Sequence, residues 1–359
     1  MESNRVAVGL SGGVDSAVTA LLLKQEGYEV EGIFMKNWDE DDDTEYCTAI
    51  QDFDDAQQVA DKLDIPLHPI NFAAEYWDSV FEDFLSEYAA GRTPNPDVLC
   101  NRNIKFAVFQ DYAEMRGAQL IATGHYARLN RDTEPIELHR ADDLDKDQTY
   151  FLQAVPRQRF ERCIFPLANL SKNEVRATAK RYSLHVYGKK DSTGICFIGE
   201  RRFDDFLNRY LPRDPGPIID TDGVVVGEHS GLAYYTLGQR QGLRIGGMRD
   251  AAEAPWYVKS KQIETNELVV TQDQAQLQAS CLLAEEPNWF VEDPTKIVRC
   301  EAIVRYRSVP KPCTIETDGT GVKVFFDEPQ RAITPGQYVA FYSGTRCLGG
   351  AKIKTVVDK

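Results

Sequence analysis

The segment Ser11-Gly-Gly-Val-Asp-Ser16 has the residue types of a phosphate-binding loop. Its two glycines allow a tight turn whose backbone N–H groups converge on an anion, and a following helix adds its positive end. Its two serines can donate hydrogen bonds to phosphate oxygens, whereas the Asp15 carboxylate suits a phosphate-bound Mg²⁺. The loop lacks the lysine of the Walker A motif. The alternative is a plain strand-to-helix turn capped by Ser or Asp.

Cys100 is the first of two cysteines with the surroundings of a reactive thiol. It follows Gly91-Arg-Thr-Pro-Asn-Pro-Asp97, a segment that its two prolines stiffen into an extended loop. We expect Cys100 at the start of the next helix, where the helix dipole and the nearby Arg102 and Lys105 favour the thiolate. Asp97 is close enough in sequence to accept or donate a proton. A buried cysteine beside a capping aspartate is the alternative.

Cys196 is the second such cysteine, in Lys189-Lys-Asp-Ser-Thr-Gly-Ile-Cys-Phe-Ile-Gly199. Glycines on both sides and the Lys-Lys pair indicate a mobile, electropositive loop that could present a thiolate to a partner protein. The alternative is a strand cysteine packed between its apolar neighbours. No two of the eight cysteines are closer than 13 residues, which excludes a C-x-x-C metal or redox site. If the phosphate loop binds ATP, two reactive cysteines point to sulfur transfer through a persulfide.

Alternating strands and helices must position these residues in the first half of the chain. The spacing of apolar residues predicts strands at 6–10, 28–35, 65–72 and 119–123 and helices at 14–25, 48–63, 73–90 and 104–115. Such alternation builds a doubly wound parallel sheet whose ligands bind at the carboxyl ends of the strands. His125 follows the last of these strands and is the histidine we place in the site, although core histidines are commoner.

The second half of the chain predicts β structure. After residues 211–217 the long helical periodicity disappears, and Gly and Pro separate short β-branched runs such as 223–226, 267–271 and 322–326. We expect an α/β domain at 1–208, a small β-rich central domain at 209–279 and a β-barrel at 280–359.

Charge is distributed unevenly along the chain. The 359 residues include 41 basic and 56 acidic side chains, a net charge of −15, which by itself disfavours nucleic-acid binding. Ten of the acidic residues lie between Asp39 and Asp61, a stretch with no basic residue, whereas Lys172–Lys190 has six basic residues and one acidic residue. Tyr306 between two arginines suits stacking and phosphate contact on unpaired RNA. We therefore expect an acidic lobe facing away from RNA and a basic face from Lys172–Lys190 and Arg305–Arg307. Ordinary solvated surfaces are the alternative.

Targeting signals are not expected. No apolar stretch reaches the length of about 18–20 residues that a membrane span needs. The first strand-like run starts a few residues after Met1 and leaves no room for a signal peptide. We expect a cytoplasmic protein without a membrane partner, and the sequence leaves its oligomeric state, including a monomer, open.

The loop resembles the modified phosphate loop of the ATP pyrophosphatases, which split ATP into AMP and pyrophosphate and adenylate a carbonyl oxygen. Further segments over nearly the whole chain resemble a narrower family of this class, the bacterial tRNA-specific 2-thiouridylases. These segments are Gly9-Leu-Ser-Gly-Gly-Val-Asp-Ser16, Phe34-Met-Lys-Asn-Trp38, Asn71-Phe-Ala-Ala-Glu-Tyr-Trp77, Gly91-Arg-Thr-Pro-Asn-Pro-Asp97, Ala122-Thr-Gly-His-Tyr126, Lys146-Asp-Gln-Thr-Tyr-Phe151, Asp191-Ser-Thr-Gly-Ile-Cys-Phe-Ile-Gly-Glu200, Tyr235-Thr-Leu-Gly-Gln-Arg240 and Thr334-Pro-Gly-Gln337.

The resemblance implies an adenine nucleotide alpha-hydrolase-like first domain that uses ATP and Mg²⁺. The residues that it implies at the ATP site are Gly9, Leu10, Ser11, Gly12, Gly13, Val14, Asp15, Ser16, Met35 and Gly124. Those that it implies at the target base of tRNA are Asn95, Pro96 and Asp97, and those elsewhere on tRNA are His125, Lys146, Asp147, Gln148, Arg305, Tyr306 and Gln337. Asp15 would bind the metal, and Asp97 would assist proton transfer.

The activity implied is ATP-dependent 2-thiolation of the wobble uridine in the anticodon stem-loop. Cys196 would accept sulfur as a persulfide from a relay protein or cysteine desulfurase, and Cys100 would be the nucleophile that pairs with it in a disulfide. Two departures from the family pattern are Arg244, where glycine is expected, and Asn103, where an acidic residue is expected. Alternative functions are an AMP-forming small-molecule ligase or amidotransferase of the same fold, and a non-catalytic tRNA-binding or sulfur-carrier protein.

Overall fold

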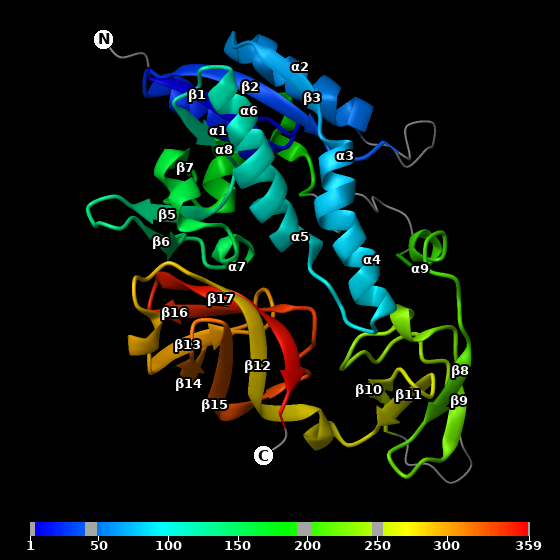
Figure 1. Cartoon of the computed structure of the whole chain (residues 1–359). Helices are drawn as coiled ribbons and strands as arrows, with labels where there is room; N and C mark the ends of the chain where they lie inside the picture. The colour runs from blue at the N-terminus through cyan, green and yellow to red at the C-terminus, as the bar shows by residue number, and fades with distance from the viewer. Residues whose placement is uncertain (1–3, 40–48, 192–202, 246–253, 358–359) are drawn as a thin grey trace.

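The computed structural model describes residues 4–39, 49–191, 203–245 and 254–357, and its first half is built on one parallel sheet (Figure 1). The strands are β1 (Arg5–Gly9), β2 (Glu29–Lys36), β3 (Leu67–Asn71), β4 (Leu120–Ala122) and β7 (Cys163–Ile164). They lie in the order β3-β2-β1-β4-β7, and all their pairings are parallel. The order reverses between β1 and β4, so the carboxyl ends of these two strands border the crevice where such sheets bind ligands.

Helices cover both faces of this sheet, which confirms the predicted doubly wound fold. The α-helices are α1 (Val14–Gln25), α2 (Ala49–Leu63), α3 (Ala73–Tyr76), α4 (Glu82–Ala89), α5 (Pro96–Leu99), α6 (Phe109–Met115), α7 (Thr149–Leu152), α8 (Lys172–Arg181) and α9 (Phe203–Leu207). Two π-helices, η1 (Trp77–Phe81) and η2 (Cys100–Val108), extend α3 and α5, and short 3₁₀ turns are η3 (Arg157–Arg162), η4 (His185–Gly188), η5 (Leu232–Tyr234), η6 (Gln274–Leu277) and η7 (Pro294–Lys296).

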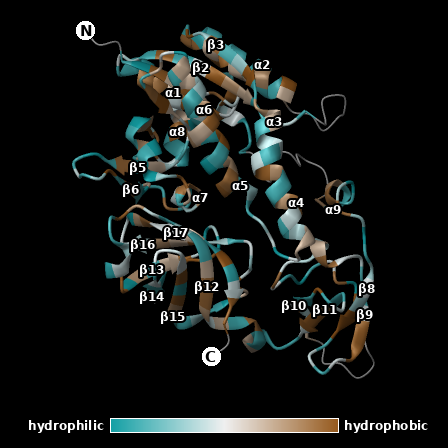
Figure 2. Cartoon of the chain, viewed as in Figure 1, coloured by the Kyte–Doolittle hydropathy of each residue, from teal (hydrophilic) through white to brown (hydrophobic). Residues whose placement is uncertain are grey.

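The alternation of β1 side chains divides the core into two layers. Val6 and Val8 lie in the layer that includes apolar side chains of α1, α2 and α8. Ala7, on the opposite face, lies in the layer that includes Ile104 and Phe109 of η2 and α6. Because β1 is covered on both faces, its five residues are nearly all buried. Figure 2 shows apolar and polar residues mixed along the surrounding helices, as expected for helices with one buried face.

A small sheet forms the central region of the chain. It contains β8 (Gly216–Ile219), β9 (Val225–His229), β10 (Tyr257–Gln262) and β11 (Glu267–Thr271) in the order β10-β11-β8-β9. The pairing of β11 with β8 is parallel and the other two pairings are antiparallel. The expected β-rich central domain is therefore present.

The last region is a closed barrel, as predicted. Its strands are β12 (Gln278–Trp289), β13 (Arg299–Ile303), β14 (Lys311–Thr317), β15 (Gly321–Arg331), β16 (Tyr338–Ser343) and β17 (Arg346–Val356), and the pairing of β12 with β17 closes it. The hairpin of β5 (Ala127–Asn130) and β6 (Glu137–Arg140) joins the same sheet through β17. The sequence did not predict this hairpin, which links the first 208 residues to the barrel. None of the described helices is long and apolar enough to cross a membrane.

Candidate active site

The loop between β1 and α1 has the compact turn expected of a phosphate loop. Gly12 has φ +73°, and a Cβ atom there would lie 2.2 Å from the backbone oxygen of Asp52, so only glycine fits. Ser16 Oγ donates to the Gly13 carbonyl at 3.0 Å and accepts from the Ser11 N–H at 3.2 Å. The serine hydroxyls that we expected to face phosphate thus also hold the loop in shape.

The other residues predicted at the ATP site lie around this loop. A Cβ atom on Gly124 would come within 2.9 Å of the Ser16 nitrogen, so the turn after β4 approaches the first turn of α1 closely. A Cβ atom on Gly9 would lie 3.3 Å from the Met35 methyl group. Leu10 and Val14 have side chains buried in the core and can offer only backbone atoms to a ligand. The ends of β1, β2 and β4 therefore bring the predicted ATP-site residues together.

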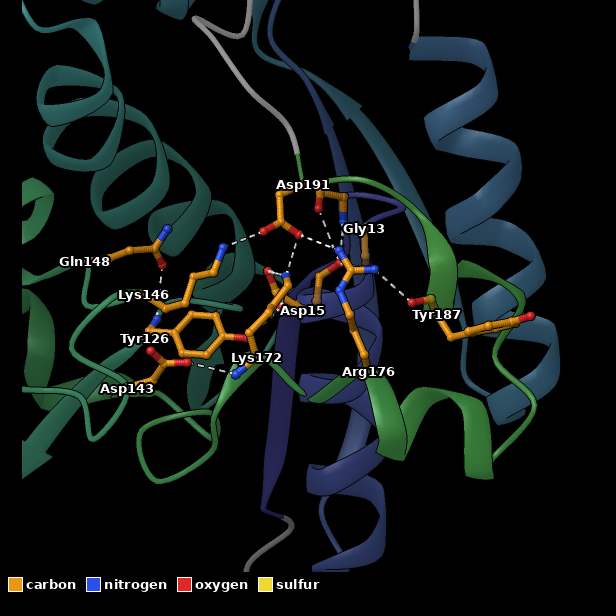
Figure 3. Close-up of polar contacts among 12 residues, drawn as sticks. Gly13, Asp15, Tyr126, Asp143, Lys146, Gln148, Lys172, Arg176, Tyr187 and Asp191 are labelled. Atoms are coloured by element: carbon orange, nitrogen blue, oxygen red, sulfur yellow. Dashed lines mark hydrogen bonds and ion pairs between the residues drawn. The ribbon is translucent and has the colours of Figure 1, made fainter. Parts of the chain in front are cut away.

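The Asp15 carboxylate is paired with a lysine that the sequence analysis did not assign to the site (Figure 3). Lys172 Nζ lies 2.8 Å from each carboxylate oxygen of Asp15, and the same ammonium lies 2.7 Å from Asp191 Oδ1. The Tyr126 hydroxyl donates to Asp15 Oδ1 at 2.9 Å. Burial, reinforced by the Asp15 charge, raises the pKa of Tyr126, so the phenol remains a hydrogen-bond donor.

The contacts of Asp15 with Lys172 affect whether Asp15 can bind the expected Mg²⁺. Within the described residues there is no group of three or more His, Cys, Asp or Glu side chains that could hold a metal ion. Both oxygens of Asp15 already accept hydrogen bonds from Lys172. The residues as they stand do not fit a resident Mg²⁺, because the carboxylate would have to lose Lys172 first. Metal binding by Asp15 stays a prediction.

Asp191 connects Asp15 to a wider set of cations. Its carboxylate contacts Lys146 Nζ at 2.7 Å and Arg176 Nη2 at 3.0 Å in addition to Lys172 (Figure 3). Burial alone would raise the pKa of Asp191, but hydrogen bonds from Lys146 and Lys172 outweigh it and lower that pKa to about 2. Lys146, which we expected on tRNA, therefore also belongs to the surroundings of the loop.

The predicted separation of acidic and basic surfaces is wrong where the two segments meet. Lys189, from the basic stretch, pairs with Asp52 and Asp55 on α2, from the acidic stretch, and also donates to the Gly12 carbonyl at 3.1 Å. Burial opposes ionisation of Asp55, but hydrogen bonds from Lys189 and His185 lower its pKa. Opposite charges of the two segments therefore neutralise each other beside the loop. They meet there because α2 and η4 pack on the same side of α1.

The predicted base-binding segment, Asn95-Pro96-Asp97, is attached to the barrel. Gln337 Nε2 donates to the carbonyls of Thr93 and Pro94 at 2.9 and 3.0 Å, and Gln337 Oε1 accepts from Asn95 Nδ2 at 3.3 Å. Gln337, which we expected to contact tRNA, uses its side-chain amide to hold this segment.

Asp97 lies in the first turn of α5. Its side chain is exposed to solvent, yet the surrounding protein atoms desolvate the carboxyl and raise its pKa, with Lys105 acting in the opposite direction. A raised pKa makes this carboxylate a stronger proton acceptor than a fully solvated aspartate. The proposed proton-transfer role remains a prediction.

Cys100 lies one turn further into the helix than expected. α5 begins at Pro96 after the cap residue Asn95, and Cys100 is the first residue of η2. Its side chain is buried in the layer that contains Phe106. Cys196 lies outside the described residues, so its separation from Cys100 is not part of the structure.

Asn103, a departure from the family pattern, joins the two π-helices. Its Nδ2 donates to the Ser79 carbonyl in η1 at 2.8 Å, a bond that an acidic side chain could not make once ionised. The Cys100 segment is therefore fixed against η1. Arg244, the other departure, has φ +51°, the left-handed conformation that glycine would adopt without strain.

Several residues expected on tRNA have their side chains directed into the protein. His125 is buried beside Phe106 and Phe165, and burial lowers its pKa well below the usual value, so the ring is neutral. The buried Asp147 pairs with Arg140 at 3.1 Å. Gln148 accepts from the Tyr126 N–H at 3.1 Å. Their contact with RNA remains a prediction.

Arg305 and Tyr306 lie at the junction of the three regions. Arg305 is exposed and lines a pocket of about 370 Å³ with Thr93, Thr236, Leu237, Gly238, Gln239, Thr334 and Gln337. The Tyr306 ring packs on Phe151 with centroids 4.4 Å apart. The pocket thus combines an available cation with residues of the segment that leads to Asn95.

Fold and loop together define the class of protein: a phosphate-loop α/β domain of the HUP type followed by two β domains. Residues 4–200 match the family model described as tRNA methyl transferase HUP domain. Residues 204–272 match the tRNA methyl transferase PRC-barrel domain, and residues 279–353 match the aminomethyltransferase beta-barrel domain.

The chain is similar to curated proteins along nearly its whole length. It is 58% identical over 353 residues to the tRNA-specific 2-thiouridylase MnmA of Pseudomonas fluorescens strain Pf0-1, covering 98% of this chain and 94% of the relative. It is 57% identical over 356 residues to the same-named protein of Pseudomonas syringae pv. syringae strain B728a, covering 98% and 95%. This chain belongs to the tRNA-specific 2-thiouridylase family, as its motifs predicted.

Similarity to solved structures is weaker. A 4-thiouridine synthetase–RNA complex with bound ATP is 15% identical, with a TM-score of 0.35, and the match covers 58% of this chain and 50% of that one. At this TM-score the likeness supports no conclusion about the site.

Proposed function

We propose that this chain is a tRNA-uridine 2-sulfurtransferase that converts the wobble uridine of the anticodon stem-loop to 2-thiouridine. The observation that carries the proposal is the family membership over 98% of the chain. The loop before α1, with Met35 and Gly124 around it, supports ATP as the co-substrate. ATP is expected to bring Mg²⁺ on its phosphate oxygens. We expect the enzyme in the cytoplasm, where tRNA and ATP occur together.

The loop residues would hold ATP so that the uracil O2 can attack its α-phosphate. The O2–P bond forms, the bond to pyrophosphate breaks, and O2 becomes part of an AMP leaving group. Converging backbone N–H groups at Gly12 and Gly13 and the positive end of α1 stabilise the phosphate charge. Flipping a loop base out for this step costs little unstacking. Asn95 and Pro96 would contact the base, and Asp97 would accept or return its proton.

The two cysteines would then complete sulfur transfer. A sulfur-relay protein or cysteine desulfurase would leave a persulfide on Cys196, and its terminal sulfur would attack C2 while AMP leaves. The Cys100 thiolate would attack Sγ of Cys196, so that the S–S bond to the transferred sulfur breaks and 2-thiouridine is released. The resulting Cys100–Cys196 disulfide would need a thiol reductant before the next cycle.

Nucleoside mass analysis tests this function. The protein is incubated with tRNA, MgATP, cysteine and a cysteine desulfurase with its relay proteins, and the tRNA is then digested. We expect 2-thiouridine and an equal amount of AMP with the wild type, and loss of at least about a hundredfold in Cys100→Ala and Cys196→Ser, because each removes a bonding partner.

Other outcomes would contradict the proposal in distinct ways. Full thiolation by Cys196→Ser would exclude the persulfide role of that residue. ATP–pyrophosphate exchange that needs a small acid and no tRNA would indicate an AMP-forming ligase. Absence of pyrophosphate release with tRNA and ATP would indicate a non-catalytic tRNA-binding or sulfur-carrier protein.

A further inference from the structure

Lys172 is a buried cation held over the phosphate loop. It is only 9% exposed, although lysine side chains are mostly found in solvent. Its ammonium contacts both oxygens of Asp15, the fifth residue of the loop segment, and Asp191 Oδ1. A buried lysine whose ammonium contacts a residue of a ligand loop is a candidate for ligand binding in its own right.

The backbone of α8 keeps this ammonium in place. Lys172 is the first residue of α8, and a capping box fixes that turn: Ser171 accepts from the Glu174 N–H, and the Glu174 carboxylate accepts from the Ser171 N–H at 2.7 Å. The Lys172 N–H also donates to Asp143 at 2.9 Å. Packing of α8 on α1 then sets the position of Lys172 relative to the loop.

Three cations lie close together beside the loop. Lys146, Lys172 and Arg176 all contact Asp191, and Lys172 also contacts Asp15. The carboxylate of Asp143 accepts only from the Lys172 backbone N–H, so it does not occupy the ammonium. The Lys172 ammonium therefore lies beside a glycine turn with the shape expected of a phosphate loop. An ammonium is a compact charge with rotatable donors, so it can exchange one carboxylate oxygen for a phosphate oxygen with a small side-chain movement.

We propose that Lys172 is a ligand of the polyphosphate group at this loop, held ready by Asp15 and Asp191. In Walker A sites a lysine of the loop itself contacts the phosphates, and this loop has no such lysine. Lys172 takes that role from α8, 157 residues after Asp15 in the chain. The inference rests on the proposed use of ATP and adds a residue to that site.

Calorimetric titration with inorganic pyrophosphate and with ATP tests the assignment. Lys172→Met is compared with Lys180→Met, which removes the same charge from an exposed position on α8. We expect Lys172→Met to weaken pyrophosphate binding about tenfold or more, Lys172→Arg to keep a larger share of the affinity, and Lys180→Met to stay within about twofold of the wild type.

A second variant separates binding from folding. Lys172→Met leaves Asp15 and Asp191 without their shared cation, so the melting temperature is measured for each protein without ligand. Combining Lys172→Met with Asp191→Asn should recover stability but not pyrophosphate affinity. Recovery of both would overturn the proposal and leave Lys172 a structural residue.

The titrations also separate this inference from the proposed function. If the wild type binds ATP and Lys172→Met binds ATP and pyrophosphate equally well, only the role of Lys172 is wrong. If the wild type binds neither ligand, the ATP-dependent function itself is contradicted.

Discussion

At the scale of single residues, the polar groups of the site are engaged with one another. Asp15, Lys172, Asp191 and Lys146 form one chain of ion pairs (Figure 3). Gln337 holds the segment before Asn95. Charged side chains that satisfy one another keep their positions before substrates arrive, and this arrangement reduces the reorganisation needed on binding.

The pKa of Asp191 predicts a contribution to acid stability. Because its folded-state pKa of about 2 is below the ordinary value of 3.8, the carboxylate stabilises the fold above about pH 4, and this stabilisation is lost as pH falls toward 2. Urea unfolding should therefore show a stability gap between wild type and Asp191→Asn at pH 5 that narrows between pH 4 and 2.5. Asp132→Asn, at an exposed turn, is the control. A gap independent of pH would contradict the assignment.

At the scale of elements, the site depends on turns and helices that are held by contacts from the barrel and from neighbouring helices. The Thr93 N–H donates to the Pro335 carbonyl at 2.9 Å, next to the contacts of Gln337. The π-helices η1 and η2 are joined through Asn103. π-Helical segments are frequent at functional sites, and here the nine-residue η2 begins with Cys100.

Gly336 lets the loop before β16 approach the Thr93–Asn95 segment. It has φ +90°, and a Cβ atom would lie 2.9 Å from the Thr93 nitrogen and oxygen. Gly336→Ala should lose ~1–3 kcal/mol from backbone strain and should also displace the segment and lower thiolation. Gly319 has a similar φ of +92° with nothing within 4 Å of its Cβ position. Gly319→Ala is therefore the control, because it introduces backbone strain without displacing a neighbouring segment.

Denaturant unfolding of the two glycine variants measures the strain, and nucleoside analysis measures the effect of the displaced segment on thiolation. A loss of thiolation in Gly336→Ala that exceeds the loss in Gly319→Ala supports docking of the segment as a requirement for activity. Equal losses in both variants would show that the contact with Thr93 has no functional part.

At the scale of the whole molecule, three sheets meet around the predicted base-binding segment. One apolar core includes Ala7 of the first sheet, Val258 of the central sheet and Tyr342 of the barrel. The β5–β6 hairpin adds backbone pairing between the first domain and β17. A continuous core of this kind holds residues from distant parts of the chain in one arrangement.

Arg305 is predicted to contact a tRNA phosphate although the protein as a whole is strongly acidic. It is exposed in the pocket at the junction, whereas Arg299 on the same barrel is paired with Asp327 at 2.7 Å. Arg305→Ala should weaken tRNA binding and reduce the slope of log K against log salt by about one, and Arg299→Ala should leave the slope nearly unchanged. Filter binding at several salt concentrations measures both, and identical slopes for wild type and Arg305→Ala would contradict an Arg305–phosphate contact.

The sequence by itself determined the local structure and the family. The apolar runs and glycines of residues 6–25 are enough to predict a strand, a tight turn and a helix, because each depends on neighbours along the chain. The predicted helix at 14–25 coincides with α1. The motifs spread over the chain identified the family that the comparisons confirmed.

Only the tertiary structure decided which side chains meet. Lys172 reaches Asp15 across 157 residues, and Asn95 reaches Gln337 across 242. The composition of Lys172–Lys190 predicts a basic surface for RNA. In the structure, however, Lys172 and Lys189 pair with carboxylates beside the loop. Such pairings depend on how helices and sheets that are far apart in the sequence pack together. Local residue spacing does not determine that packing.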